Sequence, residues 1–438
     1  MKVLIIGSGG REHALAWKIR QSPHVSELYA APGNPGIGAI AQIVNLKTSD
    51  IDAIVRFAED EKIDLTIVGP EQLLIDGIVD RFEQRGLKIF GPTRNAAELE
   101  GSKIFAKNFM QKYNIPTAVF RSFSFEERFD AERYIKEVPV TIVLKADGPA
   151  SGKGVTICET KEQALNILDR MMAGKVFGDS GLNVVIEEFL EGEEASVFVM
   201  TDGSNYVLLP PAQDHKRIFD NDQGKNTGGM GAYAPAPIIT EEALSVIEQQ
   251  IIRPVLQGMV MEGRRYKGCL YIGLMMTQTG PKVVEFNCRF GDPETQVILP
   301  LLEGDFIELA TSCATGDLSK SVTWKPQTAV CVVIASGGYP DHYETGKPIF
   351  GLDLIGTERN VLVFHAGTQT DPRTGSVVTA GGRVLGITAV GPRGDLERTI
   401  DEAYHAVEKI AFDGAYYRSD IGRKGVERLK RMKNEEQR

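Results

Sequence analysis

The stretch VVEFNCRFGDPETQ, residues 283–296, has the pattern of a β-strand that runs into a turn. Side chains on a strand alternate between its two faces. One face is therefore expected to be apolar and to carry Phe286, Cys288 and Phe290. The other face is expected to carry an acid, an amide and a guanidinium, namely Glu285, Asn287 and Arg289. Taken alone, this polar face is either a surface charge pair or a site where two oxygens bind Mg²⁺ and an arginine binds an anion.

The chain around this strand is long enough for roughly two to four domains. It has 438 residues, of which 42% are hydrophobic and 25% charged, as in globular proteins. The net charge of −10 and the pI near 5.3 disfavour a general nucleic-acid binder. No apolar run reaches about 18 residues, so no membrane span is expected, and the first residues lack a signal-peptide pattern. The five scattered cysteines contain no C-x-x-C pair, which argues against zinc or disulfides and favours the cytoplasm.

Residues 1 to about 100 alternate short apolar runs with helical stretches. Strands are expected at 2–7, 27–33, 64–70 and 88–92, and helices at 11–22, 51–63 and 73–86. This βαβ alternation predicts a parallel, doubly wound sheet. Each expected strand ends in a Gly or Pro turn, and ligands of open α/β sheets bind at those ends.

The remaining chain is expected to form a mixed α/β region followed by a β-rich region. The first has helices at 102–113 and 241–259 and strands at 139–147, 183–192, 271–276 and 282–287. Residues 213–237 lack periodicity and are expected to be a structureless loop, either functional or merely solvated. The second region has strands at 329–336, 360–367 and 382–391 and a helix at 395–410. The expected domains are 1–102, 103–325 with a flap subdomain at about 115–192, and 326–438.

The first glycine cluster, GSGGREHA at 7–14, fits a dinucleotide fingerprint only in part. Gly7 and Gly9 match, but Glu12 stands at the third glycine position, and no acid ends the next strand. A nicotinamide site is therefore disfavoured. The turn still offers backbone N–H groups and Arg11 at a helix N-terminus, which suits a phosphate as well as it suits a tight turn without a ligand.

Two further motifs are compatible with a nucleotide. KADGPASGKGV at 145–155 fails the P-loop pattern at Asp147 and Gly154, and is better interpreted as a strand followed by a glycine-rich flap. VVIEEFLEGEEAS at 184–196 is either an exposed edge or an adenine slot. In the second case, backbone groups near Glu188 and Leu190 meet the base, and a later acid meets the ribose.

Together these motifs resemble those of the ATP-grasp carboxylate–amine ligases, and most closely the phosphoribosylamine–glycine ligase family, also called glycinamide ribonucleotide synthetases. The resemblance covers residues 1 to about 425. It rests on GSGGREHAL, APGNPG, VGPE, KADGPASGKGV, EEFLEGEEAS, NTGGMGAY and above all RFGDPETQ. It implies an N-terminal sheet domain, central ATP-grasp domains and a C-terminal β-rich domain. It also implies that ATP, glycine and 5-phosphoribosylamine react through glycyl phosphate, under a flap that excludes water.

The resemblance also implies roles for individual residues. On the ATP side these are Lys103, Lys145, Gly152, Lys153, Gly154, Glu187, Glu188, Phe189, Leu190 and Glu194, with Glu193 as an alternative to Glu194. The Mg²⁺ or Mn²⁺ ligands are Glu285 and Asn287. The catalytic residues are Arg289, Lys216 and Asp214. The substrate contacts are Gly9, Gly10, Arg11, Glu12, Thr227, Gly228, Gly229, Met230 and Asp292.

Two positions depart from the family pattern. The strand at 271–276 has no acid, so a second metal ion would depend on Glu285 bridging two ions. Pro149 in the flap lacks an N–H and removes one backbone phosphate donor. The alternatives are another purine-pathway ligase, a biotin-carboxylase-like enzyme, a non-catalytic nucleotide sensor and a dehydrogenase. Small-molecule substrates, no nucleic acid, no membrane and a monomer are expected.

Overall fold

The N-terminal region forms the doubly wound parallel sheet that the sequence predicts. The computed structural model describes residues 1–148, 154–173, 182–319, 322–356 and 358–436. Its first sheet has the strand order β3-β2-β1-β4-β5, and all of its pairs are parallel. The strands are β1 (Lys2–Gly7), β2 (Glu27–Pro32), β3 (Gln42–Ile43), β4 (Leu65–Val68) and β5 (Ile89–Phe90). Its central strands are almost wholly buried, as expected for a sheet covered on both faces.

The helices of this region cover both faces of the sheet. They are α1 (Gly10–Arg20), α2 (Pro35–Gly38), α3 (Ile51–Asp60), α4 (Glu71–Ile75), α5 (Ile78–Gln84) and α6 (Arg94–Gly101). The single helix expected at 73–86 is wrong, because the chain breaks at Gly77. That glycine has φ of +88°, a left-handed conformation that glycine adopts at little cost and that ends α4 before α5 begins.

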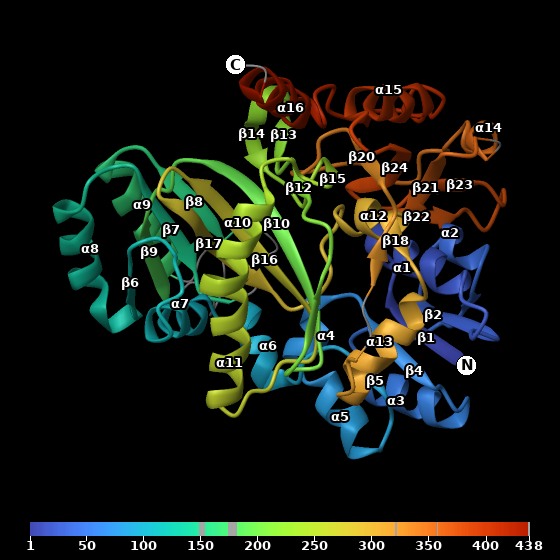
Figure 1. The fold of residues 1–438 in the computed structure, drawn as a ribbon, viewed down its shortest axis with the longest axis horizontal. Helices are drawn as coiled ribbons and strands as arrows, with labels where there is room; N and C mark the ends of the chain where they lie inside the picture. Colours follow the sequence, from blue (N-terminus) through green and yellow to red (C-terminus); the bar gives the residue numbers. More distant parts are fainter. Residues whose placement is uncertain (149–153, 174–181, 320–321, 357, 437–438) are drawn as a thin grey trace.

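The central region contains two antiparallel sheets. One has the order β11-β10-β16-β17, and the other, in the flap, has the order β6-β9-β7-β8. The strands are β6 (Phe120–Phe123), β7 (Ile142–Ala146), β8 (Val155–Cys158), β9 (Val184–Glu188), β10 (Glu193–Thr201), β11 (Tyr206–Leu208), β16 (Gly268–Thr277) and β17 (Gly280–Asn287). Figure 1 shows the flap sheet with its helices at the left, on the side opposite the blue N-terminal sheet. The flap has a core of its own around Phe123, Leu144 and Leu168, as expected for a subdomain.

The helices of the central region confirm the two that the sequence predicts. They are α7 (Lys103–Lys112), η1 (Phe125–Glu127), α8 (Arg128–Glu137), α9 (Lys161–Met172), α10 (Glu241–Ile247), the π segment η4 (Glu248–Ile252) and α11 (Arg253–Met261). The last three form one continuous run that contains Pro254. The run has a π turn just before this proline, which lacks the N–H that an α-helix needs there.

Residues 213–237 are not the structureless loop that their sequence suggests. They form β12 (Gln213–Asp214), β13 (Arg217–Phe219), η3 (Asp220–Asp222), β14 (Gln223–Asn226) and β15 (Gly231–Ala234). The strands β13 and β14 pair with each other to form the 217–226 hairpin. The expectation was wrong because such short, exposed strands show no alternation, and pairing with distant chain segments stabilises them.

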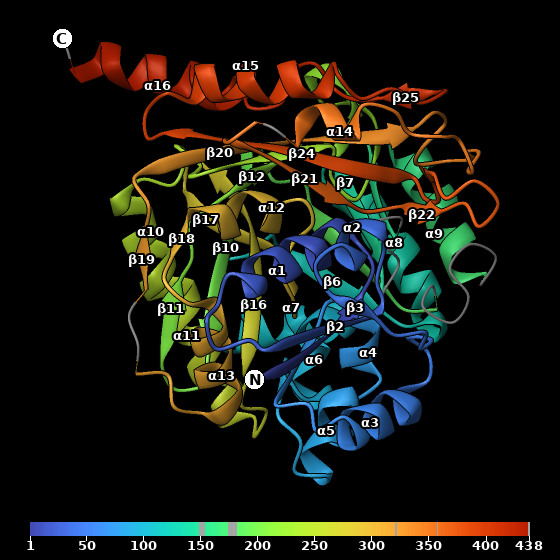
Figure 2. The ribbon, with the colours of Figure 1, turned by 90° about the vertical axis from the view of Figure 1, so that its right-hand side faces the viewer.

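The C-terminal region is built on an antiparallel sheet that β12 and β15 extend. Its order is β12-β15-β20-β24-β21, and β25 also pairs with β20. Its elements are β20 (Gln327–Ser336), α14 (Leu352–Ile355), β21 (Val361–His365), β22 (Thr368–Thr370), β23 (Val377–Thr379), β24 (Arg383–Pro392), α15 (Leu396–Val407), β25 (Ala415–Tyr416) and α16 (Arg423–Glu436). Figure 2 shows α15 and α16 lying across the outer face of this sheet.

A short connecting segment joins the central region to the C-terminal sheet. It consists of α12 (Thr295–Ile298), η5 (Leu299–Leu301), β18 (Leu302–Glu303), α13 (Phe306–Thr315) and β19 (Thr323–Trp324). Phe290 and Phe306 pack together in a core that also contains Ile5 of the N-terminal sheet and Phe364 of β21. The turn after β17 is thereby packed against both outer regions. Among the described residues, no helix is both long and apolar enough to span a bilayer.

Candidate functional site

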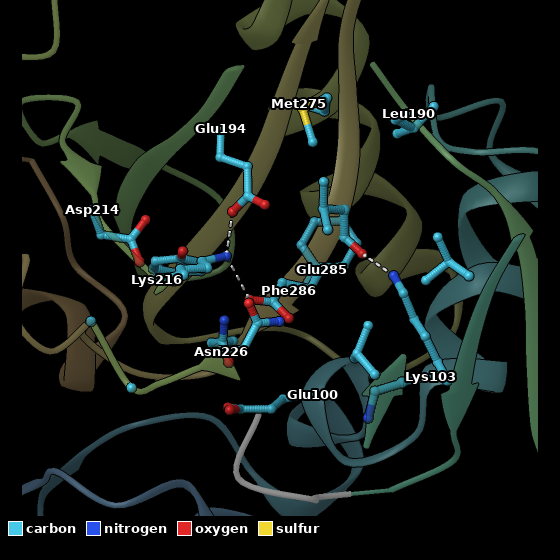
Figure 3. Close-up of a pocket in the computed structure, with 18 of the residues that line it drawn as sticks. Glu100, Lys103, Leu190, Glu194, Asp214, Lys216, Asn226, Met275, Glu285 and Phe286 are labelled. Atoms are coloured by element: carbon cyan, nitrogen blue, oxygen red, sulfur yellow. Dashed lines mark hydrogen bonds and ion pairs between the residues drawn. The ribbon is translucent and has the colours of Figure 1, made fainter. Parts of the chain in front are cut away.

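A cavity of about 880 Å³ lies where the three regions meet. The end of β17 contributes residues 284–287 and Arg289 to its wall, and α7, β7, β9, β12 and β24 contribute the facing side chains. Figure 3 shows charged side chains from several of these elements around Glu285. The carboxyl end of β17 therefore lies against a cavity.

The alternation expected for residues 285–290 is confirmed. Phe286, Cys288 and Phe290 are buried in apolar cores. Glu285, Asn287 and Arg289 are only partly buried and line the cavity. Glu285 lies opposite Gly273 of β16, where an added Cβ would lie 3.1 Å from the Glu285 Cγ. The glycine on the neighbouring strand thus leaves the room that the Glu285 side chain occupies.

Arg289 is oriented by two acids of the N-terminal region. Its Nε donates to Glu71 Oε2 at 3.2 Å, and its Nη2 lies 3.3 Å from Glu100 Oε1. Burial alone would lower the pKa of Arg289, but the carboxylates of Glu100 and Glu71 raise it above its usual value. Nη2 also donates to Asn287 Oδ1 at 3.2 Å. The guanidinium is therefore a permanently charged group with a fixed direction.

Lys216 lies between two acids of the cavity wall. Its Nζ is 2.7 Å from Glu194 Oε2 and 3.6 Å from Glu285 Oε1 (Figure 3). Burial raises the pKa of Glu285, but the ammonium groups of Lys216, Lys145 and Lys103 more than offset this and lower it below its usual value. Glu285 is therefore ionised and available to a cation.

The pKa of Asp214 is shifted in the opposite direction from that of Glu285. Burial, together with the nearby carboxylates of Glu294, Glu194 and Glu285, raises the pKa of Asp214 to about 8, against the opposing effect of Lys216. Glu294 lies in the same group and accepts a hydrogen bond from Ser196 Oγ at 3.2 Å, and burial raises its pKa as well. Near neutral pH this side of the cavity can hold or release a proton.

The opposite side of the cavity carries three lysines, two of which pair with one buried acid. Lys107 Nζ and Lys145 Nζ each lie 3.0 Å from Glu187 Oε2, while Glu187 Oε1 has no hydrogen-bond partner. Lys103 Nζ donates to the Gly148 carbonyl at 2.7 Å. Burial lowers the pKa of Lys103. The sequence analysis missed Lys107, which follows Lys103 by four positions on α7 and could have been found from helical spacing.

The other described residues assigned to ATP also line the cavity. Glu188, Phe189, Leu190, Glu193, Glu194 and Gly154 line the cavity. Glu188 accepts from the Val119 N–H at 3.0 Å and pairs with Lys282, so its carboxylate is already engaged. Glu193 Oε1 accepts a hydrogen bond from Arg428 Nη2 at 2.5 Å, whereas Glu194 forms an ion pair with Lys216. Gly152 and Lys153 lie outside the described residues.

The residues assigned to the acceptor substrate are only partly brought to the cavity. Arg11, Thr227, Gly228 and Asp292 line it, whereas Gly9, Gly10, Glu12, Gly229 and Met230 do not. Glu12 is buried and accepts hydrogen bonds from the Gly9 N–H at 2.6 Å and from Arg11 Nε at 2.7 Å. Its carboxylate therefore stabilises the glycine turn and the orientation of the Arg11 side chain. Met230 is fully buried in the C-terminal core.

The sequence analysis also missed Arg383 of β24. Its Nη1 donates to the carbonyls of Gly228 at 2.7 Å and Asp292 at 2.6 Å, and its Nη2 donates to Asp292 Oδ2 at 3.1 Å. One arginine thus joins the 227–229 turn to the turn after β17. Glu71, Glu100 and Glu294 were missed as well. Glu71 and Glu294 stood within the quoted motifs VGPE and RFGDPETQ, whereas no local signal pointed to Glu100.

The donor set fits a hard divalent cation that also binds substrate phosphates. Within the described ranges, no group of three or more His, Cys, Asp or Glu residues is placed to hold a metal ion. Glu285 and Asn287 supply two oxygens on one face, and the three lysines nearby favour anions. Mg²⁺ binds in this way, through one or two protein oxygens with the rest from water and phosphate.

Family models for phosphoribosylglycinamide synthetase match three consecutive segments. The N domain model matches residues 1–100, the ATP-grasp (A) domain model 101–295 and the C domain model 329–424. A phosphoribosylamine–glycine ligase of Caldanaerobacter subterraneus is 49% identical over 423 residues, covering 96% of this chain and 99% of the relative. That of Escherichia coli O157:H7 is 49% identical over 432 residues, covering 98% and 99%.

Solved structures agree with these matches. The phosphoribosylamine–glycine ligase of Thermotoga maritima has a TM-score of 0.83 and 36% identity, covering 96% of this chain and 100% of that chain. The biotin carboxylase domain of the Hydrogenobacter thermophilus 2-oxoglutarate carboxylase has a TM-score of 0.71 and 18% identity, covering 95% and 91%. The second likeness extends to the fold alone.

Proposed function

The chain belongs to the phosphoribosylglycinamide synthetase family, and on this premise we propose that it ligates glycine to 5-phosphoribosylamine at the expense of ATP. The products are glycinamide ribonucleotide, ADP and phosphate, as in de novo purine synthesis. The observation that carries this proposal is the convergence of Lys103, Lys145, Glu285, Arg289 and Lys216 on one cavity. This set neutralises and aligns phosphates, which is what phosphoryl transfer requires from a protein.

The first step activates the glycine carboxylate. A carboxylate is a poor acyl donor, so one carboxylate oxygen attacks the γ-phosphorus of ATP, the bond to the ADP oxygen breaks, and glycyl phosphate forms. Lys103 and Lys145 hold the transferring phosphates, and Arg289 orients the carboxylate and the acyl phosphate. Glu285 and Asn287 hold Mg²⁺ or Mn²⁺. That ion, when bound, neutralises charge on the phosphates.

The second step transfers the glycyl group. The ribosylamine nitrogen attacks the glycyl carbonyl, the bond to the phosphate oxygen breaks, and the nitrogen loses a proton. Asp214 is suited to accept this proton because burial and neighbouring acids raise its pKa to about 8. Lys216 holds the developing negative charge on the carbonyl or the phosphate. The glycine-rich turn at 148–154 is assigned to cover the site and keep water from the acyl phosphate.

The binding roles divide between the two sides of the cavity. Glu187 and the backbone of residues 188–190 receive the adenine, and the unpartnered Glu187 Oε1 favours this role. Glu194 rather than Glu193 receives the ribose of ATP, because Glu193 is paired with Arg428, which does not line the cavity, whereas the partner of Glu194 is Lys216 of the cavity wall. Arg11, supported by Glu12 and the 9–10 turn, faces the ribose phosphate of the acceptor, and Thr227, Gly228 and Asp292 contact glycine and the acceptor.

The domain limits and the setting of the enzyme belong to the same proposal. The limits are 1–102, 103–325 and 326–438. A monomer in the cytoplasm is expected, with neither nucleic acid nor membrane as partner. The five buried free thiols suit a reducing compartment.

ADP release by the purified protein tests the function directly. ATP and Mg²⁺ are supplied first with glycine alone, then with glycine and freshly made phosphoribosylamine, and finally with bicarbonate in place of glycine. Release that requires glycine and phosphoribosylamine together, with glycinamide ribonucleotide as product, supports the proposal. Release with bicarbonate and none with glycine would keep the fold and overturn the substrates.

A further inference from the structure

Arg418 is a fully buried arginine in the segment YYRSDIGRK at 416–424, and it does not itself line the cavity. Its Nε and Nη2 donate to the two Asp420 oxygens at 2.8 and 2.7 Å. Its Nη1 donates to Asp222 Oδ1 and to the Arg217 carbonyl, both at 3.0 Å. A buried guanidinium is tolerated only with such partners, and here two of the partners belong to the 217–226 hairpin.

The hairpin tip that Arg418 holds has a left-handed backbone conformation. Asn221 and Asp222 have φ of 56° and 53°, in the left-handed region. The C-terminal segment holds both, because the Asn221 N–H donates to Asp420 Oδ2 at 2.8 Å and Asp222 also pairs with Lys424. In addition, the Ser419 N–H donates to Asp220 Oδ1 at 2.9 Å. Asn and Asp adopt this region more readily than most residues, and the contacts with the C-terminal segment hold the tip in it.

The 217–226 hairpin helps to fix the position of the Lys216 backbone, from which its side chain extends. Lys216 directly precedes Arg217, whose carbonyl Arg418 binds. The Lys216 carbonyl accepts from the N–H and the Oγ1 of Thr227, both at 2.8 Å, which closes the base of the hairpin. Figure 1 shows β13 and β14 extending toward α16, with their tip beside it. The Lys216 ammonium therefore faces Glu194 and Glu285 from a hairpin that is fixed at both ends.

We propose that Arg418 is a positioning residue for ligation. Through Asp222 and the Arg217 carbonyl it fixes the 217–226 hairpin, and so holds Lys216 on the glycine and acceptor side of the cavity. This inference rests on the proposed function. The proposed adenine and phosphate contacts are built from α7, β7 and β9 instead, and among the described residues only Glu194 of β10 joins the ATP side to Lys216. Loosening the hairpin is therefore expected to weaken the use of glycine and phosphoribosylamine much more than the binding of ATP.

Asp222→Asn and Arg418→Lys test this role. Asn keeps the size of Asp222 and tolerates left-handed backbone, and Lys keeps the charge of Arg418 but loses the planar fork. For both variants the KM values of glycine and phosphoribosylamine are expected to rise at least about 10-fold, with the KM of ATP within about twofold of wild type. Asp341→Asn is the matched control. It removes an exposed ion pair to the same hairpin, in which Asp341 Oδ2 lies 2.8 Å from Lys225 Nζ. This change is expected to leave all of these KM values unchanged.

Hydrogen exchange separates this inference from the proposed function, since it requires no substrate. Faster exchange at residues 213–230 in both variants, with the KM shift, supports the positioning role. A different result would overturn the role while wild-type enzyme remains active. In that case the variants lose activity only in proportion to a lower Tm, and their KM values and hydrogen exchange equal those of wild type. If wild-type protein forms no glycinamide ribonucleotide, the proposed function fails, and unchanged exchange in the variants would separately overturn the role of Arg418.

Discussion

Lys216 Nζ lies 3.6 Å from Glu285 Oε1, although the two residues come from different sheets. Lys216 follows β12 of the C-terminal sheet, and Glu285 belongs to β17 of the central sheet. Their approach joins the side of the cavity proposed for the acceptor to the side proposed for the metal ion. Ligation at this site therefore depends on the relative placement of two sheets as well as on the residues of either one.

Replacing Glu285 by Ala is expected to abolish ligation while the fold is retained. The change removes one of two oxygen ligands for the divalent cation and leaves Lys216 without one of its two acids. Steady-state ADP release is expected to fall by at least about 100-fold. The far-UV spectrum and Tm are expected to stay close to those of Glu303→Ala, a control at an exposed acid. Normal turnover by Glu285→Ala would exclude the metal assignment.

Replacing Glu187 by Gln is expected to weaken ATP binding. The Glu187 carboxylate lies 3.0 Å from Lys107 Nζ and from Lys145 Nζ, and its other oxygen is buried without a partner. The amide keeps the shape but loses the charge, so the Kd of ATP is expected to rise about 10-fold, as measured by calorimetry. Glu188→Gln is the control on the same strand, because the Glu188 side chain pairs with Lys282 instead. Equal effects of the two changes would contradict the role of Glu187.

Replacing Asp214 by Asn is expected to increase stability at alkaline pH and to reduce activity. The pKa of Asp214 is raised to about 8 by burial and nearby acids, against an unfolded value of about 4. Between these values the folded state binds more protons, so its stability falls as pH rises toward 8. Asn does not titrate, so the variant does not lose this stability as the pH rises. Its Tm is expected to be about 2 °C higher than that of wild type at pH 8 and equal to it near pH 4. A lower Tm at pH 8 would contradict the buried, raised carboxyl.

The buried histidines between α1 and β21 are expected to make the fold sensitive to acid. His13 Nδ1 accepts the His365 N–H at 2.8 Å, and burial, with a smaller effect of His365, lowers the pKa of His13 to about 3. Burial lowers the pKa of His365 to about 4. From pH 6.5 downward the unfolded chain binds protons that the folded chain does not, so stability falls by about 1.4 kcal/mol per pH unit for each such group.

His13→Asn is expected to reduce this slope, because the amide oxygen still accepts the His365 N–H but takes up no proton. Denaturant unfolding at pH 7, 6 and 5 measures the slope. His342→Asn, at an exposed histidine, is the control and is expected to behave as wild type. An unchanged slope in His13→Asn would show that other groups cause the acid sensitivity.

The sequence by itself determined the parts of this protein that depend on local patterns. Alternation along residues 285–290 correctly predicted that Phe286 and Cys288 are buried and that Glu285 and Asn287 are more exposed. The βαβ pattern correctly predicted the N-terminal parallel sheet, and the motifs identified the family. These features could be predicted because strand and helix periods are local properties of a chain, and each motif is a short run of residues.

Only the tertiary structure decided which distant side chains meet. Arg289 is held by Glu71, 218 positions away, and Arg418 is held by Asp222, 196 positions away. The 217–226 hairpin was expected to lack structure, because its strands are stabilised by Arg418, Asp420 and Tyr416 rather than by alternation. No local period records such partners. They meet only when the three regions pack against one another. A buried charged group needs a partner, and the path of the folded chain decides which distant residue provides it.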